Sequence, residues 1–128
     1  MGFMDAVKSC FEKYATIQGR ARRAEYWWFY LFIIIAYVVG SVVAGVLSAI
    51  IPILGAVAFG ALALGAIAIL IPSICVTVRR LHDQDRSGWW ILIGFVPAIG
   101  GIVLLVFMIL RGTEGDNRFG PDPLAGEY

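Results

Sequence analysis

Residues 27–78 read WWFYLFIIIAYVVGSVVAGVLSAIIPILGAVAFGALALGAIAILIPSICVTV, a stretch without Asp, Glu, Lys, Arg or His. A single helix of that length would measure about 78 Å at 1.5 Å per residue. About 20 apolar residues are enough to cross the hydrocarbon core of a bilayer, which is about 30 Å thick. Pro52 and Gly55 stand near the middle, and proline and glycine interrupt helices. The stretch therefore predicts two membrane-crossing helices joined by a turn at 52–55.

The composition of the whole chain agrees with a membrane protein. It is 60% hydrophobic with a mean hydropathy of +0.85, whereas about half of a soluble domain is apolar. A second charge-free run, Ser87 to Leu110, is long enough for a third crossing. We therefore predict a single all-α membrane domain over 1–128. Its predicted parts are transmembrane helices at 27–51, 56–78 and 89–110 and a polar tail at 111–128.

A shorter helix is predicted at 3–15, before the first span. Apolar side chains recur there at intervals of three and four residues, at Phe3, Val7, Cys10, Phe11 and Tyr14. This pattern is typical of an amphipathic helix that lies at the membrane interface. The alternative is that the helix packs on the end of the bundle itself. No cleavable signal peptide is expected, because the first 26 residues lack a short apolar core with a cleavage site.

The positions of lysine and arginine predict the orientation. Five of the ten basic residues precede residue 27 and three lie in 79–88. Three crossings would place both segments on one face, which the positive-inside rule makes cytoplasmic. The N-terminus is then cytoplasmic and the tail external. If 89–110 is instead re-entrant, the tail returns to the cytoplasmic side.

Polar candidate residues gather in two segments that this topology places on the same face. Before the first span they are Arg20, Arg22, Arg23 and Glu25, and after the second they are Arg79, Arg80, His82, Asp83, Asp85, Arg86 and Ser87. We expect Glu25 to contact Arg79 or Arg80, because a guanidinium group suits a forked contact with a carboxylate. If the second span continues as a helix, Arg79 can pair with Asp83, which is four residues further on.

Four interpretations of these residues remain open. They are a structural ion-pair clamp, a site for anionic lipid headgroups, a ligand or ion pathway, and catalysis through His82 and an aspartate. A metal site is not predicted, since no second His or Cys stands at ligand spacing from His82. No phosphate-binding loop or nucleic-acid motif is present, so no cofactor, metal or nucleic-acid partner is expected. Cys10 and Cys75 are not expected to form a disulfide.

Small residues within the predicted spans indicate where helices pack together, and helix-breaking residues indicate where a helix is interrupted. Ala36, Gly40, Ala44 and Ser48 recur every four residues, which favours close packing of helices, either within the chain or in a homo-oligomer. Pro97, with glycines at 94, 100 and 101, predicts a kink or break in the third span. Broken helices line binding sites in some transporters.

Three ordered motifs resemble a known family. They are GRARRAEYWWF at 19–29, RRLHD at 79–83 followed by RSGWW at 86–90, and GDNRFGPDP at 115–123. Together they resemble the Domain of Unknown Function 805 family of small bacterial inner-membrane proteins. The resemblance implies a multi-pass protein of the bacterial cytoplasmic membrane and transfers no activity. It also implies a folded tail, and it marks as family-typical Arg79, Arg80, His82, Asp83, Ser87, Gly88, Asn117, Gly120 and Pro121. The candidate tail motif is Asn117, Arg118, Gly120 and Pro121.

The leading functional hypothesis is a non-enzymatic structural or accessory membrane protein. It would bind anionic phospholipid headgroups, or a membrane partner, through its basic cytoplasmic face. The alternative is a component of a small oligomeric transporter or channel that uses the break at 94–101. An intramembrane enzyme is the third hypothesis.

Overall fold

The computed structural model describes residues 1–125, so the last three residues of the predicted tail lie outside the described part. The described chain is helical and contains no strand, only an isolated bridge between Asn117 and Gly120. Its elements are α1 (Phe3–Glu12), α2 (Arg23–Ile50), α3 (Pro52–Asp83), the 3₁₀ helix η1 (Gly88–Phe95) and α4 (Gly100–Ile109).

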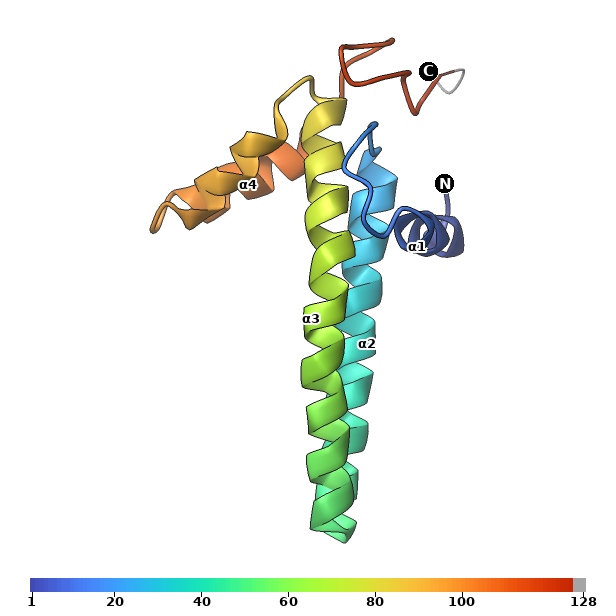
Figure 1. Cartoon of the computed structure of the whole chain (residues 1–128), viewed down its shortest axis with the longest axis vertical. Helices are drawn as coiled ribbons and strands as arrows, with labels where there is room; N and C mark the ends of the chain where they lie inside the picture. The colour runs from blue at the N-terminus through green and yellow to red at the C-terminus, as the bar shows by residue number, and fades with distance from the viewer. Residues whose placement is uncertain (126–128) are drawn as a thin grey trace.

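Helices α2 and α3 form a long antiparallel hairpin that is the axis of the molecule (Figure 1). With 28 and 32 residues, they measure about 42 and 48 Å at 1.5 Å per residue. The chain reverses at the single extended residue Ile51, and Pro52 occupies the first turn of α3, where its missing N–H is tolerated. The predicted turn at 52–55 is therefore wrong, because these residues already belong to α3.

Both long helices extend beyond the apolar spans that the sequence predicts. Helix α2 begins at Arg23 and α3 continues to Asp83, so the charged segments on either side of the apolar stretch are also helical. Hydropathy falls at these charges, but a helix ends only where its backbone leaves helical geometry.

Small residues let α2 and α3 approach closely. A methyl group at Gly40 would lie 2.8 Å from the Leu62 side chain, and one at Gly55 would lie 2.5 Å from Ser48 Cα. The Tyr37 hydroxyl donates to the Leu62 carbonyl across the same contact at 2.9 Å. The ladder of small residues is thus used within the chain, while a homo-oligomer stays a prediction.

Replacing Gly55 by alanine should force the two helices apart at the hairpin turn. The new methyl group would overlap the Ser48 side chain and backbone, and overpacking of this kind costs about 1–3 kcal/mol. Gly60→Ala is the matched control, because nothing lies within 4 Å of the position of its methyl group. SDS titration of the purified protein should show a loss of stability for Gly55→Ala alone. Equal stability of the two variants would contradict the close approach.

Helix α1 lies across α2 near the end of the hairpin that carries the charged residues (Figure 1). The Phe3 ring meets Trp28 edge-on at 5.9 Å, and the Phe11 ring meets Phe29 at 5.6 Å. Cys10, on the inner face of α1, is fully buried. The alternative that this helix packs on the bundle is confirmed by these contacts, and its position at a membrane interface stays a prediction.

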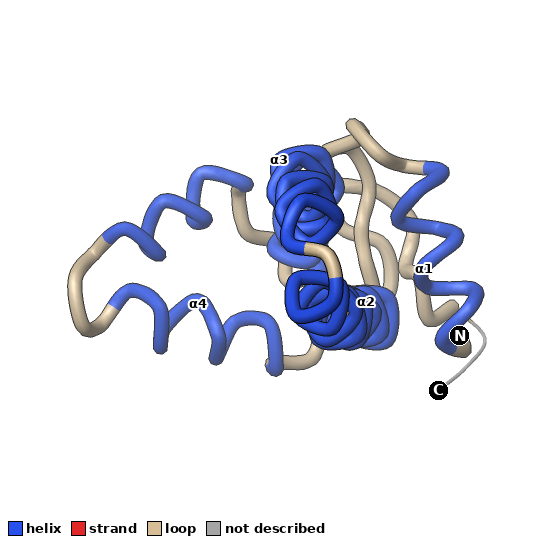
Figure 2. The backbone as a smooth tube through the Cα atoms, turned by 90° about the horizontal axis from the view of Figure 1, so that it is seen from below, coloured by secondary structure: helices blue, strands red, loops and turns tan. Residues whose placement is uncertain are grey.

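The prediction of one helix over 89–110 is wrong. This segment forms a hairpin of two short limbs, η1 and α4, which project side by side away from α3 on the side opposite α1 (Figure 2). The break falls at 96–99, where Ala98 has a φ of +68° and Pro97 stands in the predicted position. Gly100 allows the limbs to close, since a methyl group there would lie 1.7 Å from the Ile93 carbonyl oxygen.

Neither limb of this hairpin has the length of a crossing. Eight 3₁₀ residues and ten α-helical residues measure about 16 and 15 Å, which is half the thickness of a hydrocarbon core. Among the described residues, two helices, α2 and α3, are long and apolar enough to cross a membrane. Only 6% of their most apolar segments is buried, so both helices present apolar side chains outward.

Candidate functional site

A cluster of buried charged residues lies where α2 begins and α3 ends. The residues with at most 8% of their surface exposed are Arg20, Glu25, Arg79, Arg80, His82, Asp83 and Asp122. They come from the loop before α2, from both long helices and from the tail. Burial of charge is costly unless each group is paired, so the contacts of this polar cluster decide what it can do.

The first contact joins α1, α2 and α3. Arg79 Nη1 donates to both oxygens of Glu25, at 2.9 and 3.0 Å, and the Ser9 hydroxyl donates to the same carboxylate at 2.5 Å. The predicted contact between Glu25 and Arg79 is therefore confirmed. The other edge of this guanidinium group, formed by Nε and Nη2, is buried without a hydrogen-bond partner in the described chain.

Asp83 is the acceptor at the centre of the cluster. Arg80 Nη1 donates to one of its oxygens at 2.8 Å and Arg20 Nε to the other at 3.0 Å. The predicted pair of Arg79 with Asp83 is wrong. Both arginines lie within about 60° of Asp83 around the helix, but Arg79 is directed toward Glu25 on α2, so Arg80 is the one that pairs with Asp83.

Arg20 binds the tail to the end of α3. Its guanidinium group donates to the carbonyl oxygens of Thr113 at 2.5 Å, Gly115 at 2.7 Å and Gly120 at 3.3 Å. Within the tail, the Asp122 carboxylate accepts from the Gly115 backbone N–H at 2.8 Å. The tail is therefore folded against the bundle over residues 113–122, as the resemblance implied.

His82 lies beneath the tail. The Phe119 ring stacks on its imidazole with centroids 3.9 Å apart and planes inclined by 2°. Asn117 Nδ2 donates to the His82 carbonyl at 2.9 Å, and the Arg118 guanidinium lies 4.7 Å from the Phe119 ring. These three tail residues and His82 form one packed unit.

The C-terminal end of α4 is held by side chains of α2 and α3. A helix leaves its last four carbonyls without internal partners, and here each finds a donor. Gln84 Nε2 donates to Phe107, and Trp27 Nε1 donates to Met108 at 3.2 Å. Arg23 donates to Ile109 at 3.4 Å and Arg80 donates to Leu110. The cations also suit the negative end of the helix dipole.

The remaining candidate residues lie outside the buried cluster. Arg22 is half-buried, Arg23, Asp85 and Arg118 are exposed, and Pro121 is exposed in the tail. Arg86 lies 4.2 Å from the Phe107 ring centroid and 5.8 Å from that of Trp90. Ser87 caps η1 by accepting from the Trp89 N–H at 3.3 Å.

Sequence reasoning missed several members of the site. They are Ser9, Trp27, Gln84, Thr113 and Asp122. Most of their contacts run between a side chain and a backbone carbonyl or N–H. Such contacts leave no pattern in the sequence, since every residue carries these backbone groups.

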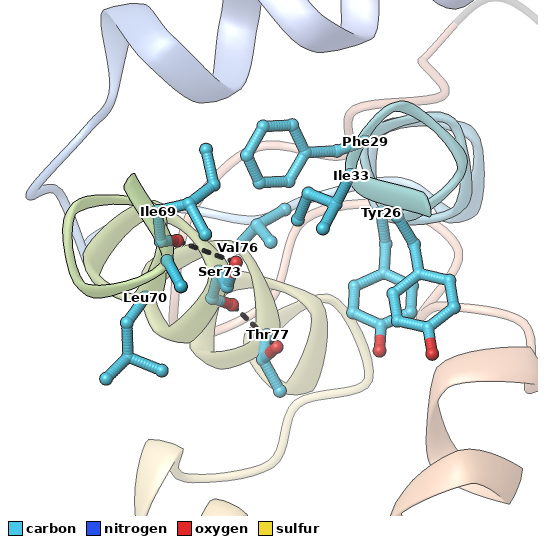
Figure 3. A pocket seen from close by; sticks show the side chains of 10 residues that line it. Tyr26, Phe29, Ile33, Ile69, Leu70, Ser73, Val76 and Thr77 are labelled. Carbon is cyan, nitrogen blue, oxygen red and sulfur yellow. Dashed lines mark hydrogen bonds between the residues drawn. The ribbon is translucent and has the colours of Figure 1, made fainter. Parts of the chain in front are cut away.

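Two grooves border α3 on the side of the η1–α4 hairpin. One, with a volume of about 240 Å³, lies between α2 and α3, where Tyr26 and Ile33 face Ser73 and Thr77 (Figure 3). The Ser73 and Thr77 hydroxyls donate to carbonyls one turn earlier in α3. The other groove, of about 470 Å³, lies between α3 and η1 under the tail.

The polar cluster contains as many buried cations as buried anions. Three buried guanidinium groups, of Arg20, Arg79 and Arg80, face the buried carboxylates of Glu25, Asp83 and Asp122. Among residues 1–125, no three His, Cys, Asp or Glu side chains are grouped so that they would hold a metal ion. The geometry corresponds to the first sequence-based interpretation, an ion-pair clamp that joins the ends of α2, α3, α4 and the tail.

Cys10 offers a probe of the docked α1. Burial, and to a smaller extent the charge of nearby Glu25, raise the pKa of its thiol to about 12. At pH 8 about one such thiol in ten thousand is ionised, against about a quarter for an ordinary cysteine. In a Cys75→Ala background, maleimide should therefore label Cys10 at least ~100-fold more slowly than an exposed cysteine in a Lys8→Cys, Cys10→Ser variant. Similar rates, followed by mass spectrometry, would mean that α1 is not docked.

The fold and the buried cluster define the class of protein to which the chain belongs. The chain is an all-helical protein with two outward-facing apolar helices of membrane length, closed at one end by a buried ion-pair cluster.

Comparison with known proteins gives the family. Residues 14–121 match the family described as "Protein of unknown function (DUF805)". The chain is 42% identical over 118 residues to Inner membrane protein YhaI of Escherichia coli (strain K12), covering 92% of this chain and 94% of the relative. It is 40% identical over 121 residues to Inner membrane protein YhaH of the same strain, covering 94% and 97%. The chain therefore belongs to the DUF805 family. No solved structure matches it.

Proposed function

We propose that this chain is a bacterial inner-membrane protein that crosses the membrane twice, through α2 and α3. The outward apolar faces of both helices support this topology, since nothing in the described chain covers them. The names of YhaI and YhaH support the location. The η1–α4 hairpin then enters the cytoplasmic leaflet and returns, so that the N-terminus and the tail share one side.

One observation carries the orientation. With two crossings, all ten lysine and arginine residues fall at the end of the hairpin where the tail docks, and the opposite turn at Ile51 carries none. The positive-inside rule assigns the basic end to the cytoplasm. Three crossings would have placed Arg111 and Arg118 on the external side.

A reporter fusion tests this topology. Alkaline phosphatase fused after Tyr128 should be inactive and green fluorescent protein at the same position should fluoresce, whereas a phosphatase inserted at Ile51 should be active. An active phosphatase at the C-terminus would restore the three-crossing arrangement and overturn the proposal.

The role that we propose is structural or accessory, non-enzymatic and dependent on anionic lipid. Arg20, Arg79 and Arg80 are buried in internal pairs, so they are not the groups that meet phosphate. Exposed cations remain at the same end, namely Lys8, Lys13, Arg23, Arg111 and Arg118. Each basic residue beside an anionic surface contributes about 1 kcal/mol.

Lipid selectivity can be measured on the reconstituted protein. Spin-labelled phosphatidylglycerol should associate with it at least twice as strongly as spin-labelled phosphatidylcholine, and salt should weaken that preference. A Lys8→Gln, Lys13→Gln, Arg111→Gln variant should lose most of the preference, whereas Gln18→Ala, at an exposed and uncharged position, serves as the control. Equal association of the two lipids with the wild-type protein would refute the lipid role.

A further inference from the structure

The groove between α3 and η1 has one polar end and a long apolar wall. Its volume of about 470 Å³ lies within the range of small-molecule sites. His82 and Ser87 line it at the loop that joins α3 to η1, while Val78 and Ile74 line it one and two helical turns further along α3. The groove is therefore amphipathic along its length.

His82 presents an unused acceptor to this groove. Its Nδ1 lies 3.0 Å from the Gly19 carbonyl oxygen, and because a carbonyl only accepts, we assign the ring proton to Nδ1. Nε2 is then an acceptor, and no described residue donates to it. The imidazole is 8% exposed, and a methyl group at Gly88 would lie 3.6 Å from Nε2. The free nitrogen thus faces the start of η1.

Ser87 supplies the complementary donor. Its oxygen accepts from the Trp89 N–H, and within the described chain no acceptor takes its hydroxyl proton. One acceptor and one donor at the end of an apolar groove match a carboxylic acid, which offers an O–H and a carbonyl oxygen. The lining contains no lysine or arginine, and Arg118, on the Phe119 ring, is paired with Asp85, so a phosphate group would find no unpaired cation on the wall of the groove.

We propose that this groove binds a single-chain fatty acid. The acid O–H donates to His82 Nε2, its carbonyl oxygen accepts from the Ser87 hydroxyl, and the chain lies along Val78 and Ile74. If the proton moves to the imidazole, the same contacts become a charge-assisted pair. Phe119, stacked on His82, closes the polar end from above.

Photolabelling of the full-length protein in maltoside micelles tests the site without a bilayer, so its result is independent of the proposed topology. The probe is palmitic acid that carries a diazirine on its chain, and labelled residues are mapped by mass spectrometry. Label should concentrate between Ile74 and Leu92, and palmitic acid should displace it at concentrations at least tenfold lower than methyl palmitate, which lacks the donor. Even labelling along α2 and α3, or equal displacement by both competitors, would overturn the proposal.

Variants separate the polar end from the apolar wall. His82→Phe keeps a ring against Phe119 but removes Nε2, and it should weaken binding about tenfold, as for one lost buried hydrogen bond. Ile74→Trp should fill the groove and weaken binding at least as much, while Ile67→Trp, exposed elsewhere on α3, should change nothing. If gel filtration shows that His82→Phe does not fold, Ser87→Ala and Ile74→Trp still test the site. If both of these variants bind palmitic acid as the wild-type protein does, the proposal is overturned.

Discussion

Replacing Arg79 by methionine should lower the free energy of unfolding by about 3–5 kcal/mol. The substitution leaves Glu25, which is 2% exposed, as a buried carboxylate whose remaining side-chain donor is the Ser9 hydroxyl. The unmet cost of burying that charge, more than the lost attraction, sets the size of the effect. SDS titration in micelles, followed by tryptophan fluorescence, measures it.

The matched control is the exposed pair of Arg111 and Glu114, whose side chains are 54% and 67% exposed. Arg111→Met should change the free energy of unfolding by less than about 1 kcal/mol.

A second substitution tests the mechanism. Adding Glu25→Leu to Arg79→Met removes both charges and should recover at least half of the loss. If the double variant is less stable than Arg79→Met alone, the buried carboxylate is not the cause of the loss.

The two long helices could be predicted from the sequence because their signal is cumulative. Dozens of apolar residues without a charge predict apolar helices of membrane length, and α2 and α3 are such helices. The ends were missed because Arg79 and Arg80 continue α3 for another turn, with their charges paired internally. Hydropathy describes transfer to lipid and carries no information about such pairing.

The segment 89–110 shows where composition stops being informative. Its apolar content is that of a crossing helix, but Gly100 lets the chain fold back against the Ile93 carbonyl. The donors that satisfy the end of α4 come from Trp27, Gln84 and Arg80, far away in the sequence. Only the packed structure brings them together, so the break could be predicted while its direction could not.

The candidate site likewise has contacts that the sequence pattern predicts and contacts that only the packed structure shows. The contact between Glu25 and Arg79 could be predicted, because both residues flank long helices that must be neighbours. The choice of Arg80 over Arg79 by Asp83 depends on the rotation of α3 about its axis, which a charge pattern does not give. The partners of Arg20 in the tail are backbone carbonyls, and these have no signature in sequence.

The second large effect is expected from Arg20→Ala. This side chain is the common partner of Asp83 and of three tail carbonyls, so its loss removes the bridge that it makes between the tail and Asp83 at the end of α3. It also leaves Asp83 with Arg80 as its remaining guanidinium partner. The stability loss should reach about 3 kcal/mol, typical of removing one partner from a buried charged network.

The loss should be local as well as large, since α2 and α3 pack together without Arg20. Limited proteolysis should therefore cut Arg20→Ala between 112 and 125 while the fragment that contains α2 and α3 stays intact. Arg111→Ala is the control, because the Arg111 side chain is 54% exposed and its ion pair with Glu114 lies within the same segment of chain. It should be cut at the rate of the wild-type protein. If both variants are cut alike, or if Arg20→Ala is cut equally within the long helices, the tail is not held by Arg20.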